Sequence, residues 1–513
     1  MATQKTQFAN FVGPSYTTKS LPIDCQLSIN WMPTPITSAA AKTKYALYPT
    51  PGYSHLTFKY LDVIYDHIPT KFPGRIRGMY YTSTGFGTDT VGALVVVAAE
   101  SVYEVRPEDV NGVHELKKLG IISNLEGQVT MADDGFGLVI SDNTTLYHIN
   151  LKTRAMSSLG TNSPLQASSV TYLNGYTVCC GKLEGVPSNT FFWSGQYANG
   201  EDDWDALSYA SAEGFADPII CVKRVGGDLW LLGPRSYEVW QSADDASLPF
   251  LRTSGSMGNI GCASAASACE IGDTLFFLGS GAMGTRKAYM SSGYTVQSIS
   301  TDALEEEWSK YKSFEDAIAF AYTQEGNTFW CVTFLTDNVT YVYCIESGSW
   351  HQRATRDEAT DTFNRWGITQ GVYAYDKIFV GSLEDTKIHR LSSDIYDEDG
   401  VQIVRVRRAP HMHNGMSMIR HASITIDMET GMGTATGAGV EPQAMLRYSS
   451  DGGRTWSSEL WLSAGKQGEY RTRMKWARLG QARDRVYELF VSAPVRWTVL
   501  GAEIETEQAV GGR

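Results

Sequence analysis

The sequence predicts an all-β protein built around a β-propeller of six or seven blades. Two observations predict this fold. An apolar strand, a small polar turn and an alternating second strand occur at Leu94–Val105 and again 44 residues later at Leu138–Ile149, which is the pattern of a β-hairpin. Looser copies then follow at intervals of about 40 to 55 residues, the length of one four-stranded propeller blade.

The looser copies extend the repeat through most of the chain. They are Asn174–Trp193, Asp228–Trp240, Asp273–Met290, Asn327–Tyr343 and Asp376–Leu391. We therefore expect the propeller to occupy residues 61–400. A helix is predicted at Ala303–Tyr311, with Asp302 as its N-cap, and it decorates one blade edge.

The two flanks of the repeat have different patterns. Residues 1–60 are rich in Pro, Thr and Ser and have no sustained period, so we expect an extended N-terminal arm packed over other elements. Residues 401–513 are again β-rich but lack the blade pattern. Strands are suggested at Val401–Arg407, Ala422–Asp427, Ala444–Tyr448, Val486–Val491 and Val495–Leu500. This flank predicts a C-terminal antiparallel β-sandwich.

The composition is that of a globular protein. The chain has 513 residues, of which 42% are hydrophobic and 12% aromatic, enough to bury a large core. Its apolar runs are far shorter than the roughly 20 residues of a membrane span, and the N-terminus lacks the pattern of a secretory signal. The eight cysteines include no C-x-x-C pair, so we expect neither a zinc site nor a disulfide framework. No cofactor is expected.

Charge divides the chain into an acidic body and a basic end. Residues 401–513 carry 15 Lys and Arg against 11 Asp and Glu, a net charge of +4, which leaves −17 on the first 400 residues. An acidic surface repels phosphate, so the propeller is a poor candidate for tight nucleic-acid binding. It remains able to line a passage through which DNA slides. Ordinary solubility also explains an acidic excess of this size.

One motif in the C-terminal flank is a full match to the Asp-box of sialidases and other glycan-processing propellers. Its residues are Ser449, Asp451, Gly453, Thr455 and Trp456. The motif predicts a hairpin turn in which the Asp451 carboxylate accepts backbone amides, Gly453 supplies a permissive φ and Trp456 packs beneath. This chemistry is structural. A sialidase also needs an arginine cluster, a tyrosine nucleophile and acidic partners, and it usually has several boxes.

Basic residues gather at two places in the same flank. Alternation along a strand places Arg405 with Arg407, next to Arg408, and places Arg471, Arg473 and Lys475 on one face. Two interpretations fit: a contact for an acidic partner or for DNA phosphate, or the solvated outer face of the sandwich.

Other apparent signals do not fit an enzyme. Gly279–Gly284 satisfies G-x-G-x-x-G, but a strand pattern follows it instead of the helix that a phosphate site needs. His411 and His413 have no carboxylate or thiol at a ligand-like spacing. No G-x-S-x-G nucleophile elbow occurs. We therefore predict a protein without catalytic residues.

A series of short motifs runs along the chain. In chain order they are Gly13–Tyr16, Asp24–Pro33, Leu47–Gly52, Arg77–Gly78, Asn259–Cys262, Gly272–Gly279, Ile299–Leu304, Leu446–Gly453 and Arg478–Gly480. This series resembles the phage packaged-DNA stabilisation protein family, the tail nozzle or hub of short-tailed bacteriophages. None of the motifs is specific alone, and their order carries the resemblance over nearly the whole chain.

The resemblance implies a structural virion protein. Such a protein assembles as a homohexameric ring below the head-to-tail adaptor on the portal, retains packaged DNA and forms the conduit for genome ejection. Its expected partners are other copies of itself, the adaptor, tail needle, fibre or spike proteins, and double-stranded DNA that passes without sequence-specific binding. We expect it in the virion tail, after assembly in the host cytoplasm. The alternative is a glycan-binding or sialidase-like propeller that carries the Asp-box.

Overall fold

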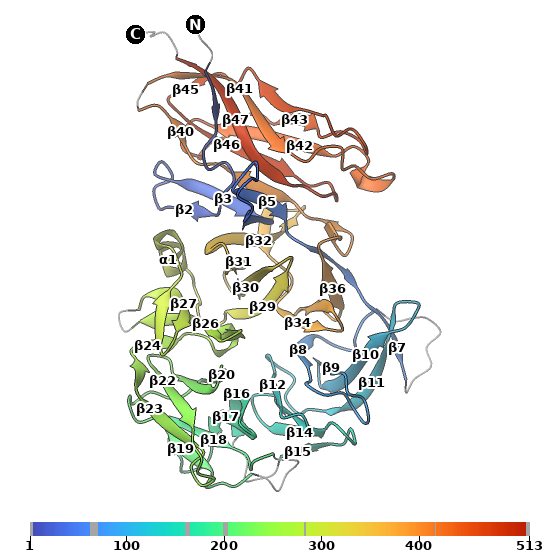
Figure 1. Cartoon of the computed structure of the whole chain (residues 1–513), viewed down its shortest axis with the longest axis vertical. Coiled ribbons are helices and arrows are strands. Elements are labelled where there is room, and N and C mark those ends of the chain that lie inside the picture. The colour runs from blue at the N-terminus through green and yellow to red at the C-terminus, as the bar shows by residue number, and fades with distance from the viewer. Residues whose placement is uncertain are drawn as a thin grey trace.

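Seven β-sheets stand around one axis as the blades of a propeller (Figure 1). The computed structural model describes residues 4–61, 70–159, 165–197, 204–281, 284–415 and 417–508. Within these residues the innermost strands follow one another around the axis as β8, β12, β16, β20, β25, β29 and β34, and β34 packs back against β8. The predicted all-β propeller is confirmed, and its blades number seven.

The first four blades contain these strands: β8 (Ile76–Tyr81), β9 (Leu94–Ala98), β10 (Ser101–Glu108), β11 (Val113–Ile121) and β7 (Thr57–Tyr60) in blade 1; β12 (Thr130–Asp133), β13 (Gly137–Ser141), β14 (Leu146–Asn150) and β15 (Met156–Ser158) in blade 2; β16 (Leu165–Leu173), β17 (Tyr176–Lys182), β18 (Thr190–Trp193) and β19 (Tyr209–Ser211) in blade 3; β20 (Cys221–Val225), β21 (Asp228–Leu232), β22 (Tyr237–Ser242) and β23 (Phe250–Gly258) in blade 4.

The other three blades contain β24 (Ile260–Cys262), β25 (Cys269–Ile271), β26 (Thr274–Gly281), β27 (Arg286–Ser292) and β28 (Thr295–Ser298), with the 3-10 turn η2 (Ala265–Ser267), in blade 5; β29 (Ile318–Gln324), β30 (Asn327–Phe334), β31 (Val339–Cys344), β32 (Ser349–Asp357) and β33 (Thr362–Arg365) in blade 6; β34 (Gln370–Ala374), β35 (Lys377–Gly381), β36 (Ile388–Ser392), β6 (Gly52–His55), β37 (Asp397–Glu398) and β38 (Val401–Gln402) in blade 7.

The repeated hairpin of the sequence forms the two middle strands of each blade. Every residue of β9 and of β13 is buried, because neighbouring blades cover both faces of these strands, and a strand covered on both faces is apolar throughout. An apolar cluster fills the space between each pair of neighbouring blades.

A strand from the N-terminal region closes the ring. β6 pairs with β36 of blade 7, from Gly52 opposite Ser392 to His55 opposite His389. The chain then enters β7, which pairs with β11 of blade 1. Residues 52–60 therefore tie the last blade to the first by backbone hydrogen bonds.

The C-terminal flank folds as the predicted β-sandwich, above the propeller in Figure 1. One sheet contains β4 (Trp31–Pro35), β5 (Tyr45–Pro49), β47 (Val499–Gln508), β41 (Ile419–Met428) and β44 (Met474–Ala477), with β1 (Gln4–Gln7) on β47 and β45 (Gln481–Ala482) on β41. The other contains β3 (Cys25–Ile29), β39 (Arg405–Arg408), β46 (Asp484–Val491), β42 (Gln443–Ser449) and β43 (Leu460–Ser463), with β2 (Tyr16–Thr17) on β3 and β40 (Met412–His413) on β46.

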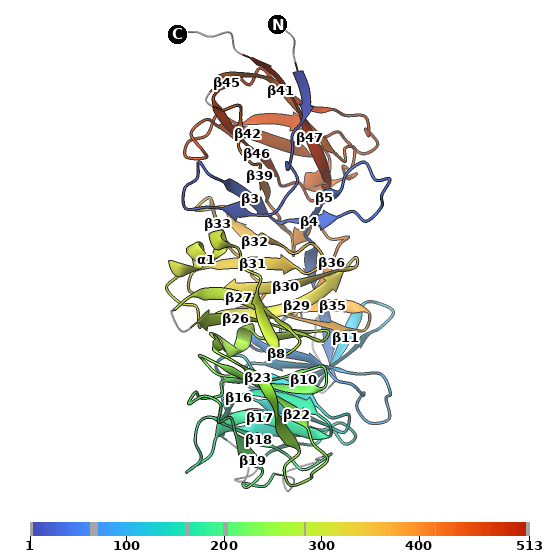
Figure 2. The ribbon, with the colours of Figure 1, turned by 60° about the vertical axis from the view of Figure 1, so that its left-hand side comes forward.

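The N-terminal strands join the sandwich to the propeller. Figure 2 shows β3 and β4 between blade 6 and the sandwich. β3 pairs with β39 on one side and meets β32 at Ile29 opposite Gln352 on the other, so one sheet runs from blade 6 into the sandwich. The arm also supplies Phe8, Phe11 and Trp31 to the sandwich core.

The predicted helix forms, but its N-cap is one residue before the predicted one. Helix α1 runs over Asp302–Ser309, and its N-cap is Thr301, whose hydroxyl accepts a bond from the Leu304 amide at 3.3 Å. The prediction of Asp302 as cap was therefore wrong. The Asp302 carboxylate accepts a bond from the Tyr16 hydroxyl at 2.6 Å, which ties the arm to the helix.

Candidate functional site: the sandwich and its junction with the propeller

The Asp-box forms a closed turn between β42 and β43. The Asp451 carboxylate accepts bonds from the Thr455 amide at 2.9 Å, the Thr455 hydroxyl at 2.6 Å and the Ser449 hydroxyl at 2.7 Å. These bonds, led by those from Thr455, hold the pKa of Asp451 well below its usual range. Gly453 has a φ of +90°, which favours glycine. The carboxylate is thus engaged within its own turn.

Trp456 of the Asp-box contacts two arginines. The guanidinium carbons of Arg408 and Arg447 are 5.0 and 4.8 Å from the centroid of its ring, at the distance of cation–π contacts. Both arginines also donate from Nε to the buried carboxylate of Glu488, with nitrogen-to-oxygen distances of 2.7 and 2.6 Å. Arg408 is therefore engaged by Glu488 and Trp456.

Arg405 and Arg407 are fully buried, and we correct the expectation that they contact a partner or DNA. Arg407 donates five hydrogen bonds to the N-terminal arm, whose acceptors are the carbonyls of Asn10, Phe11, Pro14 and Leu27 and the side chain of Gln26. Arg405 donates to the carbonyls of Ile403 and Thr50. Burial lowers the pKa of each to about 9. The predicted shared face of β39 exists, but the arm covers it.

Arg405 lies in a buried charge cluster at the junction, where it interacts electrostatically with Arg353 and Glu398. Arg353 of β32 is 3.6 Å from the Glu398 carboxylate of β37, and its guanidinium lies 3.6 Å from the centroid of the Trp366 ring. It also donates to the Pro51 carbonyl at 2.7 Å. Burial raises the pKa of Glu398. Because the cluster joins blades 6 and 7, the arm and the sandwich, it fixes the two domains to each other.

His411 forms a second tie between the arm and the sandwich. Its Nδ1 lies 2.7 Å from the Asp484 carboxylate, and its Nε2 lies 2.7 Å from the Leu21 carbonyl and 3.6 Å from the Cys25 sulfur. The Cys25 contact, with smaller contributions from Leu21 and Asp484, raises the pKa of His411 to about 9. No local pattern predicted this contact, because Asp484 and Leu21 are far from His411 along the chain.

The second basic group lies on an open face of the sandwich. Arg471 and Arg473 are exposed in the segment before β44 rather than on a strand, and within the described residues their guanidinium groups form no hydrogen bond or ion pair. Only Lys475 lies on β44, where it pairs with Glu505 at 2.9 Å. The two arginines and Lys42 line a groove of about 550 Å³, which we call the basic groove. Lys42 pairs with Asp427 there.

The centre of the propeller is a small cavity without an arginine cluster. Its volume is about 590 Å³, and the inner strands line it. Arg77 is the one arginine of that lining, and its guanidinium is engaged by the carbonyls of Ala99, Gly127 and Glu126 at 3.1, 2.9 and 2.6 Å. The described residues therefore lack the carboxylate-binding arginines that a sialidase needs at the centre.

The described residues also contain no group of three or more His, Cys, Asp and Glu side chains placed to hold a metal ion. In the same part of the chain no helix has the length and apolar character needed to cross a bilayer.

Two family profiles match the chain, one for each domain. A profile described as bacteriophage P22 Gp10, beta-propeller, matches residues 74–396, and one described as bacteriophage P22 Gp10, beta-sandwich, matches residues 404–507. No curated protein gives a significant match.

The solved structures that we compared with the chain are similar to it only at low identity and low TM-score. The extracellular domain of a hybrid two-component system from B. thetaiotaomicron is 9% identical with a TM-score of 0.41, over 77% of this chain and 43% of that one. The Neurospora crassa Pan2 WD40 domain is 7% identical with a TM-score of 0.37, over 62% and 89%. YCF48 from Cyanidioschyzon merolae is 13% identical with a TM-score of 0.37, over 63% and 97%. These scores are too low to carry a functional argument.

Proposed function

The chain belongs to the phage protein family described as bacteriophage P22 Gp10, and we propose that it is the tail nozzle or hub of a short-tailed phage. Membership in the family makes it a phage structural protein and a component of the virion. The finer role is our proposal: a homohexameric ring below the portal–adaptor complex that retains packaged DNA and forms the conduit for ejection. The observation that carries it is the match of propeller and sandwich, in order, over most of the chain.

The rigid junction between the domains supports a mechanical role. A ring that resists the pressure of packaged DNA needs subunits that do not bend between domains. Here one sheet runs from blade 6 into the sandwich, and the Arg353–Glu398 cluster and the five bonds of Arg407 brace the same region. Each subunit is therefore built to transmit load as one body.

The central cavity of the propeller bears on where DNA would pass. Its volume of about 590 Å³ is that of a small-molecule site. In the proposed ring we therefore place the conduit between subunits. The acidic propeller suits its wall, because phosphate is repelled and DNA slides without being held.

The basic groove is the surface that we assign to an acidic partner. Its exposed arginines, Arg471 and Arg473, have no carboxylate partner in the described part of the chain, whereas the first 400 residues of each copy carry a net charge of −17. The adaptor or the acidic propeller of a neighbouring copy would supply the missing carboxylates, and DNA phosphate is the competing ligand. Tail needle, fibre and spike proteins remain proposed partners without an assigned surface.

Electron microscopy of the purified protein with its cognate portal–adaptor complex tests the proposal. We expect a sixfold ring below the adaptor, and we expect Arg471→Glu with Arg473→Glu to weaken the ring. The matched control is Arg235→Glu with Arg252→Glu, which reverses two exposed charges on blade 4. If the protein stays monomeric and does not bind the adaptor, the result contradicts the nozzle assignment. A ring that forms unchanged with Arg471→Glu and Arg473→Glu would contradict only the role of the basic groove.

A further inference from the structure

A groove of about 720 Å³ opens between blades 3 and 4, far from the sandwich and the junction. It is lined by the turn between β16 and β17, the segment after β18, the turn between β20 and β21, and the end of β22. Its volume lies in the range of about 300 to 1,000 Å³ that is typical of ligand sites. None of these residues belongs to the basic groove.

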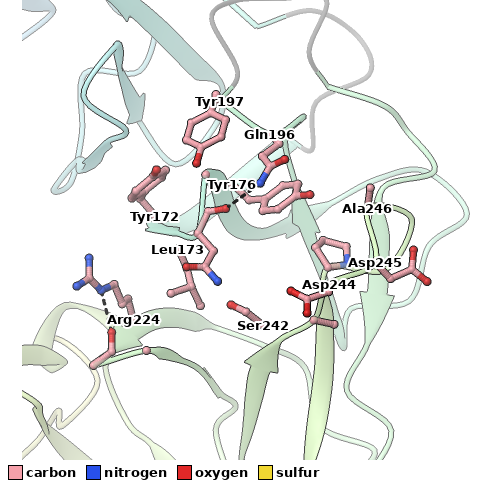
Figure 3. A pocket seen from close by; sticks show the side chains of 16 residues that line it. Tyr172, Leu173, Tyr176, Gln196, Tyr197, Arg224, Ser242, Asp244, Asp245 and Ala246 are labelled. Atoms are coloured by element: carbon pink, nitrogen blue, oxygen red, sulfur yellow. Dashed lines mark hydrogen bonds between the residues drawn. The ribbon is translucent and has the colours of Figure 1, made fainter.

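Three tyrosines form one side of this groove (Figure 3). Tyr172 is half-buried and Tyr176 is buried, with its ring 5.8 Å from that of Phe250 in an edge-on contact. Tyr197 is 53% exposed. It has a φ of +54°, rare for an aromatic residue, and its amide donates to the Gly175 carbonyl at 2.6 Å. The backbone thus holds an exposed tyrosine against the β16–β17 turn.

Charged groups of both signs and a hydroxyl complete the groove. The exposed Asp244 carboxylate faces the tyrosines across the cavity in Figure 3, whereas Asp245 turns away and binds Ser247. Arg224 lies at the other end, where its Nε donates to the Gly226 carbonyl at 3.0 Å. The Ser242 hydroxyl is buried at the floor and has no hydrogen-bond partner among the described residues.

This combination selects the chemistry of the ligand. Aromatic faces pack against the C–H faces of a pyranose ring, while a carboxylate, a guanidinium and a hydroxyl bind sugar hydroxyls, which both donate and accept. The described lining holds the Arg224 guanidinium and the carboxylates of Asp244 and Asp245, so it has no excess positive charge for a phosphate or a polyanion. We propose that the groove between blades 3 and 4 binds a short uncharged oligosaccharide.

The binding site is separate from the Asp-box and implies no hydrolysis. The Asp451 carboxylate of the box is engaged by its own turn. Among the described residues that line the groove, Asp244 is the one carboxylate that faces the cavity in Figure 3, whereas glycoside hydrolysis commonly needs a pair. The groove is therefore a recognition site, and it stands whether or not the ring proposed above forms.

Isothermal titration calorimetry of the full chain tests the inference, with maltotriose and triacetylchitotriose as neutral probes and inorganic phosphate as the charged one. We expect saturable binding of at least one saccharide and none of phosphate. Tyr197→Ala and Asp244→Asn should each weaken binding about tenfold, which corresponds to the loss of one good contact. Alanine at position 197 adds no new backbone strain, because the tyrosine already occupies the positive φ.

Tyr470→Ala is the matched control, since Tyr470 is an exposed tyrosine on the sandwich. It should bind saccharide as the wild type does, and all three variants should keep the wild-type circular dichroism spectrum. Failure of both saccharides to bind the wild type would overturn the inference. The inference would also be overturned if Tyr197→Ala and Asp244→Asn bound saccharide as tightly as the wild type, or if the protein preferred phosphate.

Discussion

Among single residues, the arginines of the C-terminal flank differ in what their guanidinium groups contact. Arg407 binds backbone carbonyls of the arm, Arg408 binds Glu488, and Arg471 and Arg473 face solvent. A buried arginine retains its charge only when acceptors surround it, and the arm supplies them for Arg407. The same residue type therefore stabilises the fold at one position and is free for a partner at another.

Replacing Asp451 by alanine is expected to lower the melting temperature. The substitution removes the acceptor of the Thr455 and Ser449 bonds and frees the end of the β42–β43 hairpin. Because hydrogen bonds depress the pKa of Asp451, its contribution is complete above about pH 4 and is lost only as the pH falls further. Differential scanning fluorimetry measures the change. Asp394→Ala, at an exposed aspartate of the propeller, should leave the melting temperature unaltered.

The raised pKa of His411 predicts that the protein loses stability as the pH becomes alkaline. Its pKa of about 9 exceeds the unfolded value of about 6.5, so its contribution is complete below pH 6.5 and is lost as the pH rises through about 9. Urea midpoints between pH 6 and pH 10 should fall more steeply for the wild type than for His411→Gln. His413→Gln, two residues away and exposed, should follow the wild type. Parallel curves for all three proteins would contradict this role.

At the scale of elements, β6 and β7 determine whether the ring stays closed. These strands come from the N-terminal region and pair with the outer part of blade 7 and with blade 1. Closure of a propeller by a distant strand removes exposed sheet edges at the point where the first and last blades meet. β6 and β7 are also the last two strands of the N-terminal arm, whose earlier strands belong to the sandwich sheets.

Gly52→Ala is expected to disturb this closure. A Cβ at position 52 would lie 2.2 Å from the Asp397 carbonyl oxygen and 2.6 Å from that of Ile395. Both obstacles are backbone, so the strand must move, at a cost of about 1–3 kcal/mol. Urea unfolding measures the loss, and limited proteolysis should cut the variant near blades 7 and 1. Gly367→Ala, which meets no atom within 4 Å, is the control.

The hairpins of the blades could be predicted because their signal is local. Leu94–Val105 and Leu138–Ile149 contain two strands and their turn in a dozen residues. The arm strands could not, because their partners are remote: Gln4 pairs with Thr506 and Leu27 with Arg408. Alternation along β39 predicted which side chains share a face but not that the arm covers it. The groove between blades 3 and 4 combines four segments and gave no sequence signal.

For the whole molecule, the sandwich is complete only with the arm. β1, β4 and β5 belong to one of its sheets and β2 and β3 to the other, and Phe8, Phe11 and Trp31 fill its core. We expect the fragment 401–513 to lack a stable fold when produced alone. Added peptide 1–50 should restore dispersed resonances in its NMR spectrum. A fragment that folds without the peptide would contradict the shared core.

Local sequence is enough to specify the repeated hairpins, the β-rich flank and the Asp-box turn, because contacts within a few residues decide each of them. Tertiary structure alone decided the closure of the ring by β6, the completion of the sandwich by the arm, and which arginines reach solvent. Each of these depends on pairing between segments hundreds of residues apart, such as Gly52 with Ser392. Local sequence does not specify such pairing, because any exposed strand edge satisfies the backbone hydrogen bonds of another. The packing of the whole chain decides which edges pair.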